Sequence, residues 1–300
     1  MPSVSVIVPV YNGVQFLEDV ITALQNQTFK DFEVIFVDDG STDLTLPTLK
    51  HLQKITNGLE IIISSIPHKG LSSARNEGIR LARGKYISFL DCDDSWYPNK
   101  LQIQVAALDD NDFGAVFSNV IYLQDSIETF NHMVNLNSEI RSPKQLLNGN
   151  SVIFGGGSNI LCRSKILNEV GGFNERLRYV EDLDMWLRLS ELTSILELPE
   201  TTVKINLRTD SMQRIEKNSV QIDLLRSKLL VYQNWFNLLD KSSFRFLIKE
   251  MCDSIIYRLR RHLFSQLFFA LTLWGFFFFK WFNFHVQKQL LPNLLKKIRE

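Results

Sequence analysis

The sequence predicts an α/β protein with a mostly parallel central sheet and helices on both faces. Apolar runs alternate with helical stretches of about 10–15 residues through the first 90 positions, which is the order of repeated β–α–β units. The apolar runs are nearly continuous, as expected for strands that are covered on both faces. Acidic and turn residues follow three of these runs, and ligands bind at the carboxyl ends of strands in such sheets.

The predicted elements follow one another in a regular order. Strands are expected within residues 3–12, 32–43, 59–65, 85–90 and 159–163. Helices are expected within 13–27, through Leu52, and within 70–84, 179–189 and 218–239. In the first helix, apolar residues from Phe16 to Leu24 recur at helical spacing. The third helix has a glycine at each end. The glycines of "GGF" (171–173) predict a structural turn.

Three acids within four positions follow the fourth strand, in the stretch "FLDCDD" (89–94). Adjacent carboxylates repel one another, and a strand that only feeds a surface loop would more cheaply end in Gly, Asn or Ser. A bound cation makes such a cluster favourable, and carboxylate oxygens suit Mg²⁺ and Mn²⁺. Two other strands also end in polar residues, Tyr11 and Asn12, and Asp38 and Asp39. Turn and capping chemistry alone does not explain paired acids at two strand ends.

Five motifs, in order, resemble family 2 glycosyltransferases with the GT-A fold. They are "SVIVPVYN", "VDDGSTD", "GLSSARNEGIRLARGKYISFLDCDD", "GGFNE" and "EDLDMWLRL", and they cover about residues 3–210. The resemblance implies a GT-A catalytic domain over residues 1–215, with a nucleotide-sugar-binding half over about 1–95 and an acceptor half over about 96–215. It implies transfer of a sugar, with inversion, from a nucleotide diphosphate sugar to an acceptor hydroxyl. UDP is the donor nucleotide expected from the family.

The resemblance also assigns nucleotide-binding and metal-binding roles. Asp91 and Asp93 match the DxD pattern, with Asp93 as the direct ligand of Mg²⁺ or Mn²⁺ and Asp91 on the ribose or a metal-bound water; Asp94 lies nearby. The other nucleotide-sugar contacts that it implies are Pro9, Tyr11 and Asn12 around the base, Asp39 on the base, and Arg75 near the nucleotide. Arg75 also reads as an ordinary helix-surface residue.

An inverting transfer needs a general base at the acceptor hydroxyl, and a buried carboxylate suits this role. Glu181 and Asp182 begin the helix within 179–189, where they would otherwise read as residues that cap the helix and complement its dipole. The resemblance makes Asp182 the base and Glu181 a supporting or acceptor-binding residue, with Asp184 as the alternative base. It also places Gly156 and Gly157 at the border of the acceptor site.

Two loops carry weaker candidates. His68 is expected to be a solvated loop residue. In the segment 206–214, Arg208 is a candidate phosphate contact and Arg214 a weaker one. This segment has no histidine, which puts a third protein ligand for the metal in doubt.

The end of the chain differs in charge from the rest. Residues 241–300 contain 11 Lys/Arg against 3 Asp/Glu, whereas the first 240 residues contain 22 against 30. Residues 216–300 are expected to form a helical C-terminal region, whose apolar segment 263–284 is rich in Phe. A buried core helix, a spanning helix and a helix in the membrane plane compete, and basic residues on both sides favour the helix in the membrane plane.

These expectations combine into one functional prediction. Three widely spaced cysteines predict a reducing compartment, and no signal peptide is evident at the start of the sequence. We expect a hexosyltransferase-type enzyme at the cytoplasmic face of the membrane, peripheral or with one C-terminal membrane segment. Its acceptor would be a glycan or a lipid-linked saccharide of cell-envelope polysaccharide biosynthesis, and no nucleic acid is expected as a partner.

Two other functions compete with this prediction. A non-catalytic sugar-nucleotide-binding or scaffold protein of the same fold could have lost Asp93 or Asp182, and both are present. A nucleotidyltransferase would be expected to carry a glycine-rich phosphate loop after the first strand, where this chain has "PVYNG".

Overall fold

The computed structural model describes most of the first 238 residues. The described residues are 1–124, 127–132, 138–140, 142–147, 156–207, 224, 227–228, 230–232 and 234–238. The chain divides into two units, Met1–Leu238 and Leu239–Glu300. The catalytic domain predicted over 1–215 lies within the first unit, and where it ends stays a prediction.

Several predictions fall outside the described residues. They concern Arg208, Arg214 and the apolar segment 263–284. Of the helix predicted over 218–239, the described residues from 224 to 235 are helical. None of the helices in the described part of the chain combines the length and the apolar character that crossing a bilayer requires.

The first half of the chain forms the predicted parallel sheet. Its strands are β1 (Val4–Val10), β2 (Phe32–Asp38), β3 (Glu60–Ser65) and β4 (Tyr86–Phe89), in the spatial order β3-β2-β1-β4 with every neighbouring pair parallel. All seven residues of β1 and of β2 are buried. The near-continuous apolar runs are therefore strands covered on both faces, as predicted.

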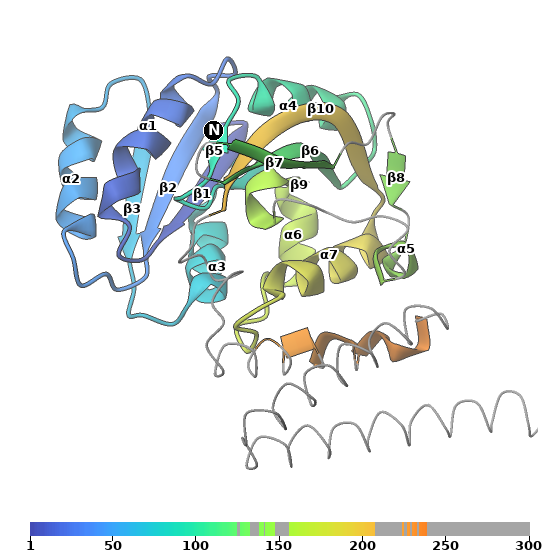
Figure 1. The fold of residues 1–300 in the computed structure, drawn as a ribbon. Coiled ribbons are helices and arrows are strands. Elements are labelled where there is room, and N and C mark those ends of the chain that lie inside the picture. The colour runs from blue at the N-terminus through green and yellow to red at the C-terminus, as the bar shows by residue number, and fades with distance from the viewer. Residues whose placement is uncertain are drawn as a thin grey trace, which may run out of the picture. The chain divides into compact units, whose positions relative to one another are not determined.

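Helices cover both faces of this sheet (Figure 1). The helices of this half are α1 (Leu17–Gln25, preceded by the 3-10 turn η1, Val14–Phe16), α2 (Thr45–Ile55), α3 (Leu71–Leu81) and α4 (Lys100–Asp109). The even-numbered valines of β1 pack with α1, α2 and α4 in one cluster. Ile7 points to the opposite face, which α3 covers. A Cβ at position 78 would lie only 2.3 Å from Ile7 Cγ2, so α3 packs closely on the strand because residue 78 is a glycine.

The second half of the sheet is mixed rather than mostly parallel. It adds β5 (Ser95–Trp96), β6 (Ala115–Gln124), β7 (Ile127–His132), β8 (Ser138–Ile140), β9 (Leu161–Arg163) and β10 (Ile195–Asn206), and the order continues β4-β9-β6-β10-β5. Among the strands described in this half, β6 and β10 pair in parallel and the other pairs are antiparallel; β9 runs antiparallel to both of its neighbours. Two register shifts in β10 bend it into the long curved strand of Figure 1.

Three further helices and two 3-10 turns complete the described part. They are α5 (Pro143–Leu147), η2 (Gly156–Asn159), α6 (Ser164–Val170), α7 (Glu181–Leu192) and η4 (Phe236–Leu238), with helical residues also between 224 and 235. Trp186 of α7 packs edge-to-face on Phe117 of β6, with ring centroids 5.5 Å apart. This contact brings the start of α7 to the same sheet as the acids after β4.

Candidate active site

The polar residues that follow β1, β2 and β4 meet at one edge of the sheet. Backbone hydrogen bonds fix this arrangement, because Asp39 N donates to Val10 O at 2.8 Å and Leu90 N donates to Ile7 O at 2.9 Å. Asn12 has a left-handed backbone, with φ of 48°, and its Oδ1 accepts from Thr42 N at 2.8 Å. The loops after β1 and β2 are thus linked, as the parallel order of the strands predicts.

Five carboxylates lie near one another at this edge, and three of them, Asp91, Glu181 and Asp182, surround one arginine. We refer to all five as the acid cluster: Asp91, Asp93, Asp94, Glu181 and Asp182. The arginine is Arg75, whose Nη2 lies 2.8 and 2.9 Å from the two oxygens of Asp91. Its Nη1 donates to Glu181 Oε1 at 2.9 Å. Arg75 is 1% exposed, so its reading as a helix-surface residue is wrong; a contact with the nucleotide stays a prediction.

The glycine turn η2 packs directly against this cluster. A Cβ on Gly157 would lie 2.8 Å from Arg75 Nη2, and one on Gly156 would lie 3.4 Å from Asp182 Oδ2. Ser158 Oγ donates to Asp94 Oδ2 at 2.6 Å and accepts from Asp91 N at 3.0 Å. The acceptor contacts assigned to the two glycines stay predictions. Ser158 was missed because a serine beside glycines reads as an ordinary turn residue.

Burial and mutual repulsion control the charge of the cluster. Burial raises the pKa of Asp94 well above its ordinary value, and Asp91 and Asp93 raise it further. Burial also raises the pKa of Glu181, although the charge of Arg75 opposes this. The pKa of Asp182 is raised by burial against the opposing effects of the Leu183 backbone N–H and Arg75. The cluster therefore favours binding a proton or a cation.

A divalent metal fits this site only together with a ligand that brings further oxygens. No group of three or more metal-ligating side chains is assembled in the described residues, and both oxygens of Asp91 are held by Arg75. Asp93, the other acid of the DxD pattern, is half-buried. Mg²⁺ is commonly held by one or two carboxylates plus substrate phosphates, so the residues present fit a metal that arrives with a diphosphate.

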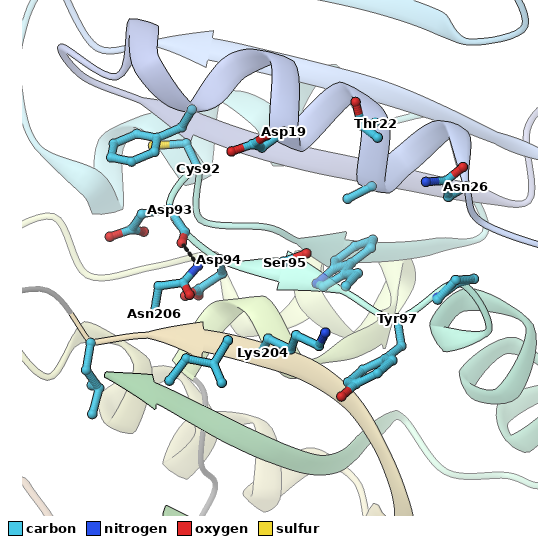
Figure 2. Close-up of a pocket in the computed structure, with 16 residues that line it drawn as sticks. Asp19, Thr22, Asn26, Cys92, Asp93, Asp94, Ser95, Tyr97, Lys204 and Asn206 are labelled. Atoms are coloured by element: carbon cyan, nitrogen blue, oxygen red, sulfur yellow. Dashed lines mark hydrogen bonds between the residues drawn. The ribbon is translucent and has the colours of Figure 1, made fainter. Parts of the chain in front are cut away.

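A groove leads away from the acid cluster on the α1 side (Figure 2). Its volume is about 900 Å³, and it is lined by α1, the loop after β4 and the end of β10. Asp93 and Asp94 stand at one end, and Tyr97 and Lys204 stand further along it (Figure 2). Asn206 Nδ2 donates to Asp93 O at 2.7 Å, which ties the end of β10 to the acid loop.

The predicted base pocket contains His68, for which the sequence predicted only a solvated position in a loop. His68 stacks on Tyr11 with ring centroids 4.1 Å apart, and its Nδ1 lies 2.8 Å from Asp39 Oδ2. The His68 side chain is 53% exposed, as expected for a solvated loop residue. The contacts with Tyr11 and Asp39 were not predicted. Asp39 also accepts from the backbone N–H groups of Lys69 and Gly70, both at 2.9 Å. A lone loop histidine carries no pattern by which this could be predicted.

Comparison with sequence families finds one match that covers more than half of the chain. The family is described as glycosyl transferase family 2, and its model matches residues 5–171. An uncharacterized glycosyltransferase of Rickettsia prowazekii is 30% identical over 228 residues, which are 73% of this chain and 69% of that protein. The UDP-Glc:alpha-D-GlcNAc-diphosphoundecaprenol beta-1,3-glucosyltransferase WfaP of Escherichia coli is 30% identical over 63% of this chain and 70% of its own length.

Solved structures with the same fold are more distant in sequence. S. aureus TarS 1-349 in complex with UDP-GlcNAc has a TM-score of 0.60 and 19% identity, and the match covers 84% of this chain and 80% of that chain. Mannosyltransferase PcManGT from Pyrobaculum calidifontis, in complex with GDP-Man and Mn²⁺, has a TM-score of 0.59 and 16% identity over 99% and 79% of the two chains. At these identities the likeness concerns the fold.

Proposed function

This chain belongs to glycosyl transferase family 2, and we propose that it is an inverting enzyme whose general base is Asp182. It is a glycosyltransferase with a GT-A-like mixed α/β fold, and its donor is a nucleotide sugar. The observation that carries the proposal is the acid cluster, in which a buried carboxylate at the start of α7 lies beside the acids that follow β4. A non-catalytic scaffold protein offers no reason for five carboxylates, most of them half-buried, to lie so close together.

The geometry of Asp182 suits removal of a proton from an acceptor hydroxyl. Leu183 N donates to Asp182 Oδ1 at 2.7 Å, which leaves Oδ2, on the side of Gly156, for the incoming proton. As the acceptor oxygen bonds to the anomeric carbon of the donor sugar, its proton passes to Asp182 Oδ2. The bond from the anomeric carbon to the diphosphate breaks with its electron pair on the nucleotide diphosphate, and attack from the opposite side inverts the sugar.

We propose that Asp93 holds Mg²⁺ or Mn²⁺ together with the donor. A metal bound there supplies positive charge next to the leaving diphosphate. The structural neighbour with GDP-Man and Mn²⁺ supports this assignment at the level of the fold. Asp91, which Arg75 holds through both oxygens, is then a group that accepts hydrogen bonds from the donor or from water on the metal.

The donor and the acceptor are proposed from the relatives. UDP is favoured because TarS binds UDP and UDP-GlcNAc, and Tyr11 with its stacked His68 offers a flat aromatic surface for a base. A lipid-linked or polysaccharide acceptor is favoured by the name of WfaP. We further propose that the basic region 241–300 binds the cytoplasmic face of a membrane, through the segment 263–284 lying in the membrane plane or crossing it.

Thermal shift with UDP, GDP and dTDP, each with and without Mn²⁺, tests the donor site. A ligand that binds the native state raises its melting temperature, so one nucleotide should raise it in a Mn²⁺-dependent manner. Asp93→Asn should remove the Mn²⁺ dependence while the melting temperature without ligand stays near that of the wild type. No shift with any nucleotide, for a folded sample of the full chain, would favour the non-catalytic alternative.

A further inference from the structure

Arg75 connects two carboxylates that the proposed mechanism assigns to different substrates. Asp91 lies on the donor side and Glu181 lies beside the base, on the acceptor side. We propose that Arg75 is a positioning residue that fixes Asp91 relative to Glu181, and that residue 157 is a glycine because the guanidinium must pass close to its backbone. This inference rests on the proposed function, because it gives the two carboxylates their separate tasks.

Only an arginine has the shape that this contact requires. Its Nη2 reaches both oxygens of Asp91 and its Nη1 reaches Glu181 at 2.9 Å, so one planar group spans two acids. Glu181 is 106 positions away from Arg75 in the chain and belongs to the other half of the fold. A lysine has one nitrogen on a flexible stem and cannot hold both acids at a fixed separation.

The surroundings of Arg75 hold its guanidinium in place. The side chain is buried, and its Cζ lies 5.1 Å from the centre of the Phe173 ring. Burial alone would lower the pKa of Arg75, but the charges of Asp91 and Glu181 outweigh it and raise this pKa, so the group stays charged. Its Nε is buried and has no hydrogen-bond partner among the described residues. The position of the group is therefore set by the two acids, at the cost of one unsatisfied donor.

A gain in the stability of the fold is a weak explanation for the buried ion pairs of Arg75. Replacing a buried ion pair by apolar residues of similar volume is often neutral or stabilising. The arrangement is better explained by the geometry that it imposes on the acids of the site. A displacement of a reacting group by about 1 Å can lower a rate by about 100-fold.

Gly157 supplies independent support. Its backbone does not have a positive φ, so the chain conformation does not demand a glycine. A Cβ there would lie 2.8 Å from Arg75 Nη2 and 3.0 Å from Cζ. Any side chain at this position would push the guanidinium away from the two acids, so the close approach of Arg75, rather than the turn, explains why residue 157 is a glycine.

The inference separates turnover from nucleotide binding. Both terminal nitrogens of Arg75 donate to carboxylates, and the side chain is 1% exposed, so the guanidinium is directed at the two acids rather than at the phosphates of the donor. Loss of the guanidinium should therefore slow transfer and leave the affinity for the nucleotide nearly unchanged. A phosphate-binding arginine would behave in the opposite way.

The test compares Arg75→Lys with Arg80→Lys in the full chain. Arg80 lies on the same helix, is exposed and pairs only with Glu77 among the described residues. Calorimetry measures the Kd of UDP with Mn²⁺, and nucleotide release measures kcat with UDP-glucose, UDP-N-acetylglucosamine and GDP-mannose. We expect Arg75→Lys to lower kcat by about 100-fold with a Kd within about threefold of wild type, and Arg80→Lys to change neither.

Two results would overturn the inference. A Kd raised tenfold or more with kcat unchanged would make Arg75 a donor ligand, and an unchanged kcat in folded Arg75→Lys would make it merely structural. A wild type that binds no UDP and releases no nucleotide from any of the three donors would instead reject the proposed function, and this inference with it.

Gly157→Ala keeps the test valid if Arg75→Lys does not fold. It leaves every charge in place and should lower kcat by moving the guanidinium. When the two changes are combined, the loss in kcat should be no larger than that of Arg75→Lys alone, because residues that act through one contact are not additive. Losses that multiply would contradict a shared action through the guanidinium.

Discussion

Asp182 stands at the first turn of α7 with its carboxylate turned into the acid cluster. The residue before the helix, Val180, has a left-handed backbone with φ of 54°, which is rare and strained for a β-branched residue. This conformation directs Glu181 and Asp182 back toward the sheet edge, where Arg75 pairs with Glu181. Strain that persists beside such a cluster of acids is typical of a functional site.

The raised pKa of Asp182 predicts an acid limit to the reaction. A base acts only when deprotonated, so turnover should fall as the pH drops through a pKa that lies above the ordinary 3.8 of an aspartate, because burial raises it. The pH dependence of kcat, measured with saturating nucleotide sugar and Mn²⁺, shows this limit. A rate that stays constant down to the ordinary aspartate range would contradict the role of Asp182.

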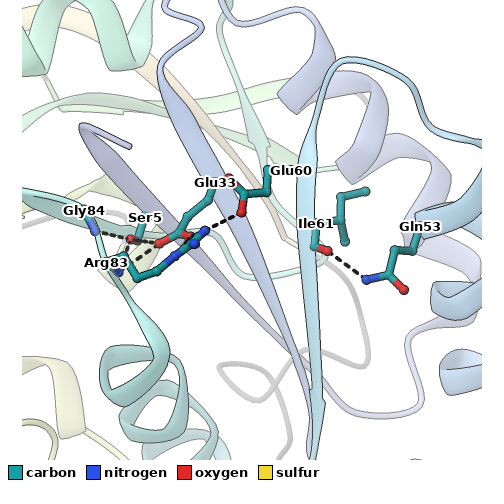
Figure 3. Close-up of polar contacts among 7 residues, drawn as sticks. All are labelled: Ser5, Glu33, Gln53, Glu60, Ile61, Arg83 and Gly84. Carbon is teal, nitrogen blue, oxygen red and sulfur yellow. Dashed lines mark hydrogen bonds and ion pairs between the residues drawn. The ribbon is translucent and has the colours of Figure 1, made fainter. Parts of the chain in front are cut away.

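At the scale of elements, the edge of the sheet opposite the acid cluster is held by a buried glutamate (Figure 3). Glu33 of β2 accepts from Ser5 Oγ of β1 at 2.6 Å and from Arg83 Nε at 2.8 Å. Arg83 also pairs with Glu60 of β3, so one network ties the amino ends of three strands. This network supports the sheet without touching the site.

Glu33→Gln should destabilise the protein, whereas Glu60→Gln is the matched control. Glu33 is buried and Glu60 is exposed, yet both pair with Arg83. We expect a loss of about 1–3 kcal/mol for Glu33→Gln and well under 1 kcal/mol for Glu60→Gln, measured by urea unfolding. Equal losses for both variants would contradict the importance of burial.

The same network predicts a pH dependence of stability. Burial alone would raise the pKa of Glu33, but hydrogen bonds from Ser5 and Arg83 outweigh it and lower this pKa below 4.5. The stabilisation is therefore present above the unfolded pKa and is lost as the pH falls through the folded pKa. The wild type should lose more stability than Glu33→Gln across this range in urea unfolding at several pH values; parallel losses would argue against it.

The turn between α6 and α7 depends on two adjacent glycines for different reasons. Gly171 and Gly172 both have positive φ, of 84° and 76°, but only a Cβ on Gly172 would clash, 2.6 Å from Asn76 Oδ1. That oxygen accepts from Phe173 N at 2.7 Å. Gly171→Ala should cost about 1 kcal/mol through backbone strain, and Gly172→Ala clearly more, in thermal unfolding. Equal costs would mean that the contact with Asn76 contributes nothing.

At the scale of the whole molecule, the sequence predicted the first half of the fold better than the second. Strands such as β1 and β2 are long apolar runs separated by helical periodicity, and these signals are local. Strand β5 has two residues, too few for any periodicity, and β9 was expected as a strand within 159–163 but without its pairing. Their antiparallel pairing follows from neighbours distant in the sequence, which explains why the mixed half of the sheet was not predicted.

The residues of the site also differ in how well the sequence predicts them. The acids after β4 were predictable because they are adjacent in the sequence and repel one another. The burial of Arg75 could not be predicted, because its partner Glu181 is 106 positions away in the chain and only the fold brings the two residues together. Ser158 and His68 gave no signal either, since their contacts are also made across the fold.

The uneven charge of the chain predicts salt-sensitive membrane binding. Residues 241–300 carry eight more basic than acidic residues, and each basic residue near an anionic surface contributes about 1 kcal/mol at low salt. The full chain should co-sediment with vesicles that contain anionic lipid and bind vesicles of neutral lipid less. Raising the salt concentration should weaken the binding to anionic vesicles. Equal binding to both vesicle types would argue against an electrostatic contribution.

The central claim is that Asp182 is the general base. The most direct test measures both the kcat and the affinity for UDP of Asp182→Asn, with Asp184→Asn as the comparison. Asp184, which the resemblance gave only as the alternative base, pairs with Arg188 on its own helix, 2.7 Å from Nη2. Asp182→Asn should bind UDP with Mn²⁺ as the wild type does while kcat falls by about 10²–10⁴-fold, and Asp184→Asn should keep most of its turnover. Transfer by Asp182→Asn at the wild-type rate would contradict the account.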